Sequence, residues 1–187
     1  MINIYYIISY LSLAVWIAVA FRQRKSNFRF LYYLLATLDA SSFIIYFMFH
    51  SGPGIFLAGV GLLLPLTIYP DAIKKYFKII LASVILITGI LIYTWANIYN
   101  YTTIIATGLT TILFLQLNIK RFFTQKKFSF FEFIMAFYFL TVMTKFLSLK
   151  LDSQFGLPLF YVTTILQLII GFILIIRTED FFFLKVK

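Results

Sequence analysis

The chain consists of long apolar segments separated by short polar stretches that contain most of its basic residues. A helix that crosses a bilayer needs about 20 mostly apolar residues, and the hydrophobic pattern predicts seven such segments. They are residues 3–21, 28–49, 54–69, 76–98, 102–122, 130–149 and 157–176. We therefore expect an all-α fold: a single domain over residues 1–187, built as a bundle of seven transmembrane helices.

The distribution of the basic residues predicts how this bundle is oriented. Of the 16 Lys and Arg residues, 14 lie in alternate connections and in the C-terminal tail, and the opposite connections contain only Lys150. Connections on the cytoplasmic side of a membrane are enriched in Lys and Arg. The pattern therefore predicts an N-terminus outside and a C-terminus in the cytoplasm. The first segment lacks a basic leader and a small-residue cleavage site, so we expect it to remain as the first helix.

The composition supports the membrane interpretation. Hydrophobic residues make up 63% of the chain and charged residues 12%, whereas soluble domains are about half apolar and a quarter charged. The net charge of +10 is divided among short connections that leave no folded basic domain. We therefore expect membrane lipids, and possible further membrane-protein subunits, as partners, and no nucleic acid. The bias toward Phe, Ile, Tyr and Lys is typical of AT-rich bacterial genomes, so we expect a bacterial inner membrane.

The inventory of reactive side chains narrows the possible chemistry. The chain has no cysteine and one histidine, His50, at the end of a predicted span. This excludes disulfides, thiol nucleophiles and zinc–thiolate sites within the chain, and a site with several histidines. We expect no metal and no cofactor. Any function must then reside inside the bundle or on its faces.

Two ionisable residues lie deep in predicted spans, where each costs about 2.5–3.5 kcal/mol on insertion scales. They are Asp39, near the middle of the second segment, and Lys145 in the sixth, and we expect them at similar depths. They would either form a polar site that binds a headgroup, with Asp39 as a candidate general base or proton carrier, or make a structural ion pair or hydrogen bonds. Further candidate members of this site are Ser42, Thr141 and Gln167.

The third segment contains small residues and a proline. Gly54 and Ala58 are four residues apart and Gly61 follows, and such residues allow helices to approach closely. Pro65 removes a backbone hydrogen bond and predicts a kink. The alternative is a broken helix whose exposed carbonyls contact a substrate, as in transporters.

Two stretches carry a resemblance to a known family. They are FLAGVGLLLPLTIY (56–69), and AFYFLTVMTKFLSL with LPLFYVTTILQLIIG (within 136–171). They resemble segments of the lysoplasmalogenase-like (YhhN-type) membrane family, namely its F-x-x-G segment and its later paired helices. Asp39 would match the family's early acidic residue. The family has eight spans, a glycine where Leu38 stands, and a later acidic residue near the position of Thr141.

The resemblance implies hydrolysis of the vinyl-ether bond of lysoplasmalogens by paired carboxylates. The single deep carboxylate and the short connections instead favour a non-enzymatic integral membrane protein. It would bind lipid, or act as an accessory subunit of a larger complex, with a polar site around Asp39 and Lys145. The alternatives are a lysoplasmalogenase-like hydrolase that uses Asp39, and a small-solute or proton-linked carrier.

Overall fold

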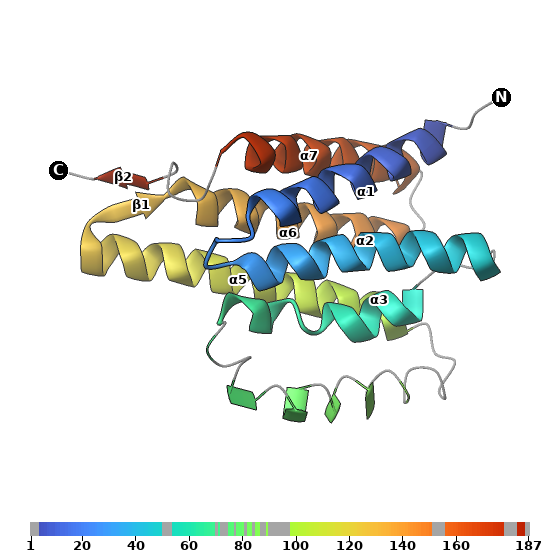
Figure 1. Ribbon diagram of the computed structural model, residues 1–187, viewed down its shortest axis with the longest axis horizontal. Coiled ribbons are helices and arrows are strands. Elements are labelled where there is room, and N and C mark those ends of the chain that lie inside the picture. Colours follow the sequence, from blue (N-terminus) through green and yellow to red (C-terminus); the bar gives the residue numbers. More distant parts are fainter. Residues whose placement is uncertain are drawn as a thin grey trace.

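The computed structural model is a bundle of helices that run alternately in opposite directions (Figure 1). It describes residues 4–49, 54–69, 71, 75–76, 78–80, 82–83, 85–86, 89, 98–150, 156–177 and 183–185. The elements are α1 (Ile4–Arg22), α2 (Arg29–Phe49), α3 (Gly54–Gly61), the 3-10 helix η1 (Pro65–Ile68), α5 (Ile98–Gln125), β1 (Lys127–Ser129), α6 (Phe130–Lys150), α7 (Gly156–Ile176) and β2 (Phe183–Lys185). The chain is mostly helical, as its hydrophobic pattern predicts.

The helix bounds follow the predicted segments closely. α1, α2, α6 and α7 each begin and end within one residue of a predicted segment, and α5 extends past its segment at both ends. The described positions between 75 and 89 are helical. The other positions of the predicted span 76–98, apart from residue 98, lie outside the described residues. Among the described residues, two helical stretches are long and apolar enough to cross a membrane, Tyr101–Gln125 and Phe130–Ser148.

The third predicted segment is not one continuous helix. Proline lacks an amide hydrogen, and its ring collides with the carbonyl four residues earlier, which for Pro65 is that of Gly61. The α-helix ends at Gly61, and Leu64 N donates to Gly61 O at 2.9 Å in place of the missing bond. Pro65 then begins η1. The expected kink is therefore a break in the helix.

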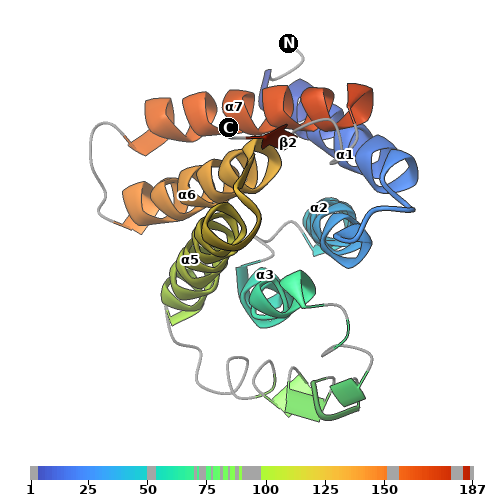
Figure 2. The ribbon, with the colours of Figure 1, turned by 90° about the vertical axis from the view of Figure 1, so that its left-hand side faces the viewer.

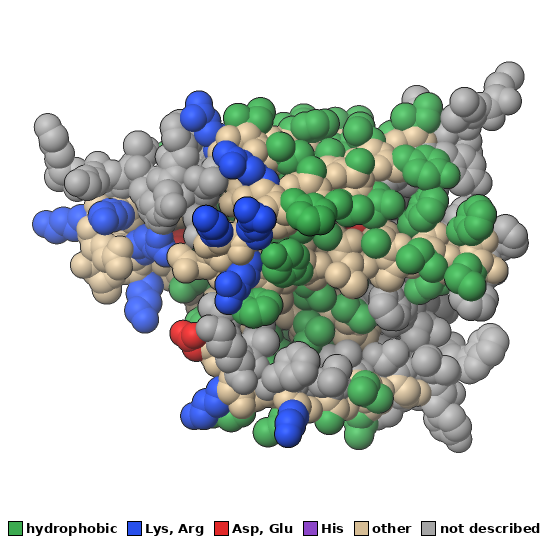
Figure 3. Space-filling view, in the orientation of Figure 1, with side chains coloured by type: hydrophobic (Ala, Val, Ile, Leu, Met, Phe, Trp, Pro, Cys, Tyr) green, Lys and Arg blue, Asp and Glu red, His purple; other side chains and the backbone are tan. Residues whose placement is uncertain are grey.

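Several connections meet at one end of the bundle, which we call the basic end. The Gln23 amide, just after α1, donates to Leu174 O at 2.6 Å and to Arg177 O at 2.8 Å, at the end of α7. Between α5 and α6, β1 pairs with the tail strand β2 in antiparallel register, Lys127 opposite Lys185. This ribbon is absent from the sequence prediction. Figure 3 shows Lys and Arg gathered at this end, and hydrophobic side chains over the rest of the visible face.

The basic half of the bundle has a tightly packed aromatic core. Phe28, Tyr32, Phe114, Phe131 and Phe139 are all buried. The Phe28 and Phe131 ring centroids are 5.1 Å apart, and Phe114 stacks on Phe139 at 6.0 Å. Large aromatic side chains contribute much of the buried area in such a core. These ring contacts join α2, α5 and α6, the three helices that Figure 2 shows from the basic end.

Packing is looser away from the basic end. The buried apolar positions of α2 recur at helical spacing up to Leu38, and the described side chains of residues 39–45 are half-buried or exposed. On α6, residues 142–146 are likewise half-buried. Polar side chains at this boundary therefore retain access to the surroundings of the protein.

Exposed apolar side chains form stripes along α5, α6 and α7. The stripes consist of Ile105, Leu109, Ile112, Leu115 and Ile119 on α5, Phe133, Phe137, Leu140 and Leu147 on α6, and Ile165, Ile169, Phe172 and Ile176 on α7. Their spacing of three, four or seven residues places each set on one helix face. Contiguous apolar surface of this extent is unusual for a monomeric soluble protein.

A polar site between four helices

Asp39 is held by a serine on the neighbouring helix. Ser12 is ten residues before Arg22, at the end of α1, and Asp39 is ten residues after Arg29, at the start of α2. Because the two helices are antiparallel and rise about 1.5 Å per residue, both side chains lie about 15 Å from the basic end. The Ser12 hydroxyl donates to Asp39 Oδ2 at 2.7 Å. Asp39 remains half-buried.

Lys145 brings a positive charge to the same region from α6. Its Nζ donates to Thr164 Oγ1 on α7 at 3.1 Å, and its charge interacts electrostatically with Asp39. Tyr138, two turns before Lys145 on α6, is also buried. The site therefore draws one polar side chain or more from each of α1, α2, α6 and α7.

The other three side chains expected in this site have different environments. Ser42 Oγ donates to Leu38 O at 2.6 Å and Thr141 Oγ1 donates to Tyr138 O at 2.7 Å, so each hydroxyl binds its own helix. Gln167 is 8% exposed, and its Nε2 has no hydrogen-bond partner among the described residues. It lies about one turn from Thr164 on α7. Gln167 thus offers a buried donor close to the site.

Sequence reasoning missed Ser12 as the partner of Asp39. Nothing in the local sequence distinguishes Ser12 from the other hydroxyl residues of the spans. The signal available was depth, because Ser12 and Asp39 lie equally far from the basic residues that end α1 and begin α2. Equal depth on consecutive antiparallel helices predicts that two polar side chains can meet.

The small residues of α3 have different surroundings. Ala58 is fully buried, in a helix that packs on α5. A Cβ on Gly61 would meet no atom of the described residues within 4 Å, so close helix approach at Gly61 stays a prediction. Gly61 is where the α-helix ends before Pro65. Gly54 begins α3, and what surrounds it lies outside the described part of the structure.

Close helix approach occurs at a glycine that sequence reasoning did not identify. A Cβ on Gly171 of α7 would collide with the Val15 side chain of α1. Gly171 lies in a segment of bulky apolar residues, and this contrast is the signal that could have identified it. The contact brings α1 against α7 between the polar site and the basic end.

A fully buried ionisable group lies at the basic end. Glu132, in the first turn of α6, is 0% exposed and pairs with Arg121 of α5, with Nη2 and Oε1 2.8 Å apart. Ser129 caps α6 by accepting from Glu132 N at 3.2 Å, while Asn118 Oδ1 accepts from Ser129 N at 3.3 Å. In a capping box the glutamate itself would bind the Ser129 amide. Asn118 takes that role, which leaves the Glu132 carboxylate for Arg121.

The polar site has the chemistry to hold a polar or zwitterionic group. It offers a carboxylate that accepts hydrogen bonds, and an ammonium group and an amide that donate them. A comparison of the chain with protein families, with curated proteins and with solved structures finds no match in any of the three. The resemblance to the lysoplasmalogenase-like family therefore stays a prediction, and the functional argument depends on the site.

Proposed function

We propose that the chain is an integral membrane protein that binds the polar headgroup of a lipid, or of a similar amphiphile, at Asp39 and Lys145 without converting it chemically. The observation that carries the proposal is the pair of opposite charges on α2 and α6. Each is half-buried and held by a hydroxyl from a neighbouring helix. In this proposal the chain crosses a bacterial inner membrane seven times, with the basic end in the cytoplasm.

The exposed apolar stripes on α5, α6 and α7 support insertion into a membrane. In water, contiguous apolar surface of this kind favours aggregation, whereas in a bilayer it faces acyl chains. The gathering of basic side chains at one end (Figure 3) fits the cytoplasmic side, where anionic headgroups attract them. Asp39, about 15 Å from the basic end, is then near the centre of a hydrocarbon core about 30 Å thick.

A hydrogen-bond donor without a partner among the described residues favours ligand binding at this site over a purely structural contact. A buried donor without a partner costs about 1–3 kcal/mol, and Gln167 Nε2 is such a donor among the described residues. A ligand that accepts from Gln167 would recover this cost. Lys145 would hold a phosphate, and Asp39 would accept from an ammonium or hydroxyl group.

The position of Glu132 argues against paired-carboxylate catalysis. Glu132 and Lys145 are 13 residues apart on α6, which corresponds to about 20 Å along the helix, and Arg121 engages the Glu132 carboxylate. Asp39 would therefore act without a second carboxylate from α6 beside it. A binding protein, or a lipid-binding accessory subunit of a larger complex, requires no such partner.

The test compares lipids that co-purify with the full-length protein and its variants. We expect native mass spectrometry to detect one tightly retained lipid per wild-type chain, and its loss in Asp39→Asn, Lys145→Gln and the double variant. Asp71→Asn and Lys75→Gln make the same chemical changes at exposed positions and should retain the lipid.

Other results would replace the proposal. Equal lipid content in all variants would contradict it. Lysolipid turnover that Asp39→Asn abolishes would establish a hydrolase, and proteoliposome flux that Asp39→Ala abolishes would establish a carrier. Release of the wild-type protein from membranes by alkaline washing would contradict membrane insertion itself.

A further inference from the structure

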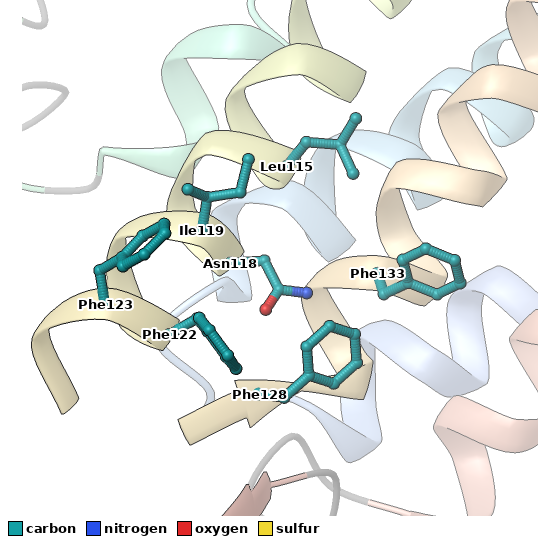
Figure 4. Close-up of a pocket in the computed structure, with 7 residues that line it drawn as sticks. All are labelled: Leu115, Asn118, Ile119, Phe122, Phe123, Phe128 and Phe133. Atoms are coloured by element: carbon teal, nitrogen blue, oxygen red, sulfur yellow. The ribbon is translucent and has the colours of Figure 1, made fainter. Parts of the chain in front are cut away.

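An apolar pocket opens on the surface of the bundle beside the basic end, away from Asp39. It has a volume of about 300 Å³ and lies between the last turns of α5, β1 and the first turn of α6. Figure 4 shows the four phenylalanines that surround it: Phe122, Phe123, Phe128 and Phe133. The volume is at the lower end of the range for small-molecule pockets. The lining favours an apolar chain.

The one polar lining side chain is already engaged. Asn118 Nδ2 donates to Ser129 O at 2.9 Å and its Oδ1 accepts from Ser129 N. A ligand inside the pocket therefore finds little hydrogen-bonding capacity to use. This selects for hydrocarbon over a polar small molecule.

The pocket is continuous with the exposed apolar stripe of α5. Ile119 is 56% exposed and Phe133 49% exposed, and both line the pocket. Leu115 and Ile112 lie on the same face, one and two turns further from the basic end than Ile119. A chain lying along this stripe would thus enter the pocket without crossing a polar barrier.

Basic residues flank the pocket at its polar edge. Lys120 follows the lining residue Ile119, while Lys126 and Lys127 precede Phe128. Lys126 has a φ of 48°, where the chain turns out of α5 into β1. The register then places Lys127 opposite Lys185. Like charges at directly opposite positions are destabilising, so an anion at this edge would stabilise the ribbon.

Among the described residues, the carboxylate of this region is engaged elsewhere. Glu132 is buried and paired with Arg121, on the α5–α6 interface, while Lys120 and Lys126 are exposed. Apolar lining and exposed positive charge therefore lie side by side. This combination matches a lipid that has both an acyl chain and an anionic headgroup.

We propose that this pocket binds one acyl chain of an anionic phospholipid from the cytoplasmic leaflet, with the phosphate near Lys120, Lys126 and Lys127. The proposal depends on the membrane insertion and orientation proposed above, and not on the Asp39 site. A second copy of the chain, or a helix of another subunit, would be the competing occupant. The experiment below separates these cases.

The first test measures lipid selectivity by native mass spectrometry of the full-length protein with phosphatidylglycerol and phosphatidylcholine. We expect preferential retention of phosphatidylglycerol. Leu115→Trp, which fills the pocket, should reduce it, whereas Ile112→Trp, on the same exposed face outside the pocket, should not. Lys120→Gln, Lys126→Gln and Lys127→Gln together should reduce it at least tenfold, since each lysine near an anionic surface contributes about fivefold. Lys75→Gln with Lys78→Gln is the matched control.

Photo-crosslinking gives a second readout that does not depend on the tryptophan variants folding. Phosphatidylglycerol with a diazirine on its acyl chain should label peptides that contain Phe123 or Phe133. Equal retention of both lipids, or no difference between Leu115→Trp and Ile112→Trp, would overturn the proposal. The chain has no cysteine of its own, so Phe133→Cys can report contact between two copies by forming a disulfide dimer. Dimers that still form in excess phosphatidylglycerol would also overturn the proposal. Crosslinks to the peptides that contain Phe123 or Phe133 should persist in Asp39→Asn even though that variant loses the lipid of the polar site, which separates the two outcomes.

Discussion

The Ser12 hydroxyl on α1 donates a 2.7 Å hydrogen bond to the Asp39 carboxylate on α2. The bond joins two consecutive helices about 15 Å from the basic end, among largely apolar side chains. A carboxylate in such surroundings is costly unless its oxygens are hydrogen-bonded. Ser12 therefore stabilises the charge that the proposed headgroup site requires.

Replacing this serine tests its structural contribution. We expect Ser12→Ala to lower the free energy of unfolding by about 1–3 kcal/mol, because Asp39 loses a hydrogen-bond donor. For a chain of this length the melting temperature should fall by about 2–4 °C for each kcal/mol. Thermal unfolding in detergent would measure this. Ser41→Ala is the control, since Ser41 Oγ donates to Thr37 O of its own helix, and an equal effect of both variants would contradict the prediction.

Gln23 provides a second test, at the basic end. Its amide nitrogen donates to two carbonyls at the end of α7 and its side chain is 2% exposed. Gln23→Leu leaves both carbonyls without this donor, at about 1–3 kcal/mol for each one that water cannot reach. We expect hydrogen exchange to increase in the last turn of α7. Gln116→Leu, at an exposed position of α5, should change neither hydrogen exchange nor stability. If Gln23→Leu left the amide protection of α7 unchanged, Gln23 would not hold the end of that helix.

The helices were predictable because each one repeats a simple pattern. A run of about 20 apolar residues between polar or turn-forming connections gives both ends of a helix, as for α2 and α6. The 54–69 segment has the same composition, yet Pro65 ends the α-helix early, because one missing amide hydrogen has more effect than average hydropathy. The β1–β2 ribbon was not predictable from short strands of three residues that lie more than 50 positions apart.

The candidate site was predictable only in part. Asp39 and Lys145 stand out because charge is rare in apolar segments. Ser12 does not, since hydroxyl side chains usually bind within or between helices. Whether a hydroxyl binds its own helix, as Ser42 does, or another helix, as Ser12 does, depends on helix rotation. That rotation is set by packing contacts such as Gly171 against Val15, and no local pattern identifies the residue on the partner helix.

The two glycines Gly171 and Gly61 form a matched pair for testing helix packing. A Cβ at position 171 collides with Val15, while one at position 61 meets open space. Overpacking costs about 1–3 kcal/mol, so Gly171→Ala should be destabilising by this amount and should separate α1 from α7. Gly61→Ala should be neutral or stabilising by up to about 1 kcal/mol, since alanine has the higher helix propensity. Urea or thermal unfolding of both variants measures these changes in stability. A greater loss of stability in Gly61→Ala than in Gly171→Ala would contradict the packing described.

The Arg121–Glu132 pair predicts an asymmetry between its two single variants. Arg121 is 27% exposed at its side chain and Glu132 is 1% exposed. Arg121→Gln leaves a buried carboxylate without its cationic partner, at a cost of about 3 kcal/mol, the lower end of the range for a broken buried pair. Glu132→Gln leaves an arginine that can turn toward water, so we expect a smaller loss.

A double-mutant cycle tests this interpretation quantitatively. With both residues replaced by Gln, stability should recover relative to Arg121→Gln alone, because the buried charge is gone. Lys120→Gln, one residue away and exposed, controls for the loss of one positive charge at the basic end. Strictly additive effects of the two substitutions would mean that Arg121 and Glu132 do not interact. Equal losses of stability in the two single variants would mean that burial of the carboxylate does not determine the cost of breaking the pair. The helix cap formed by Ser129 and Asn118 would then hold the start of α6 without the ion pair.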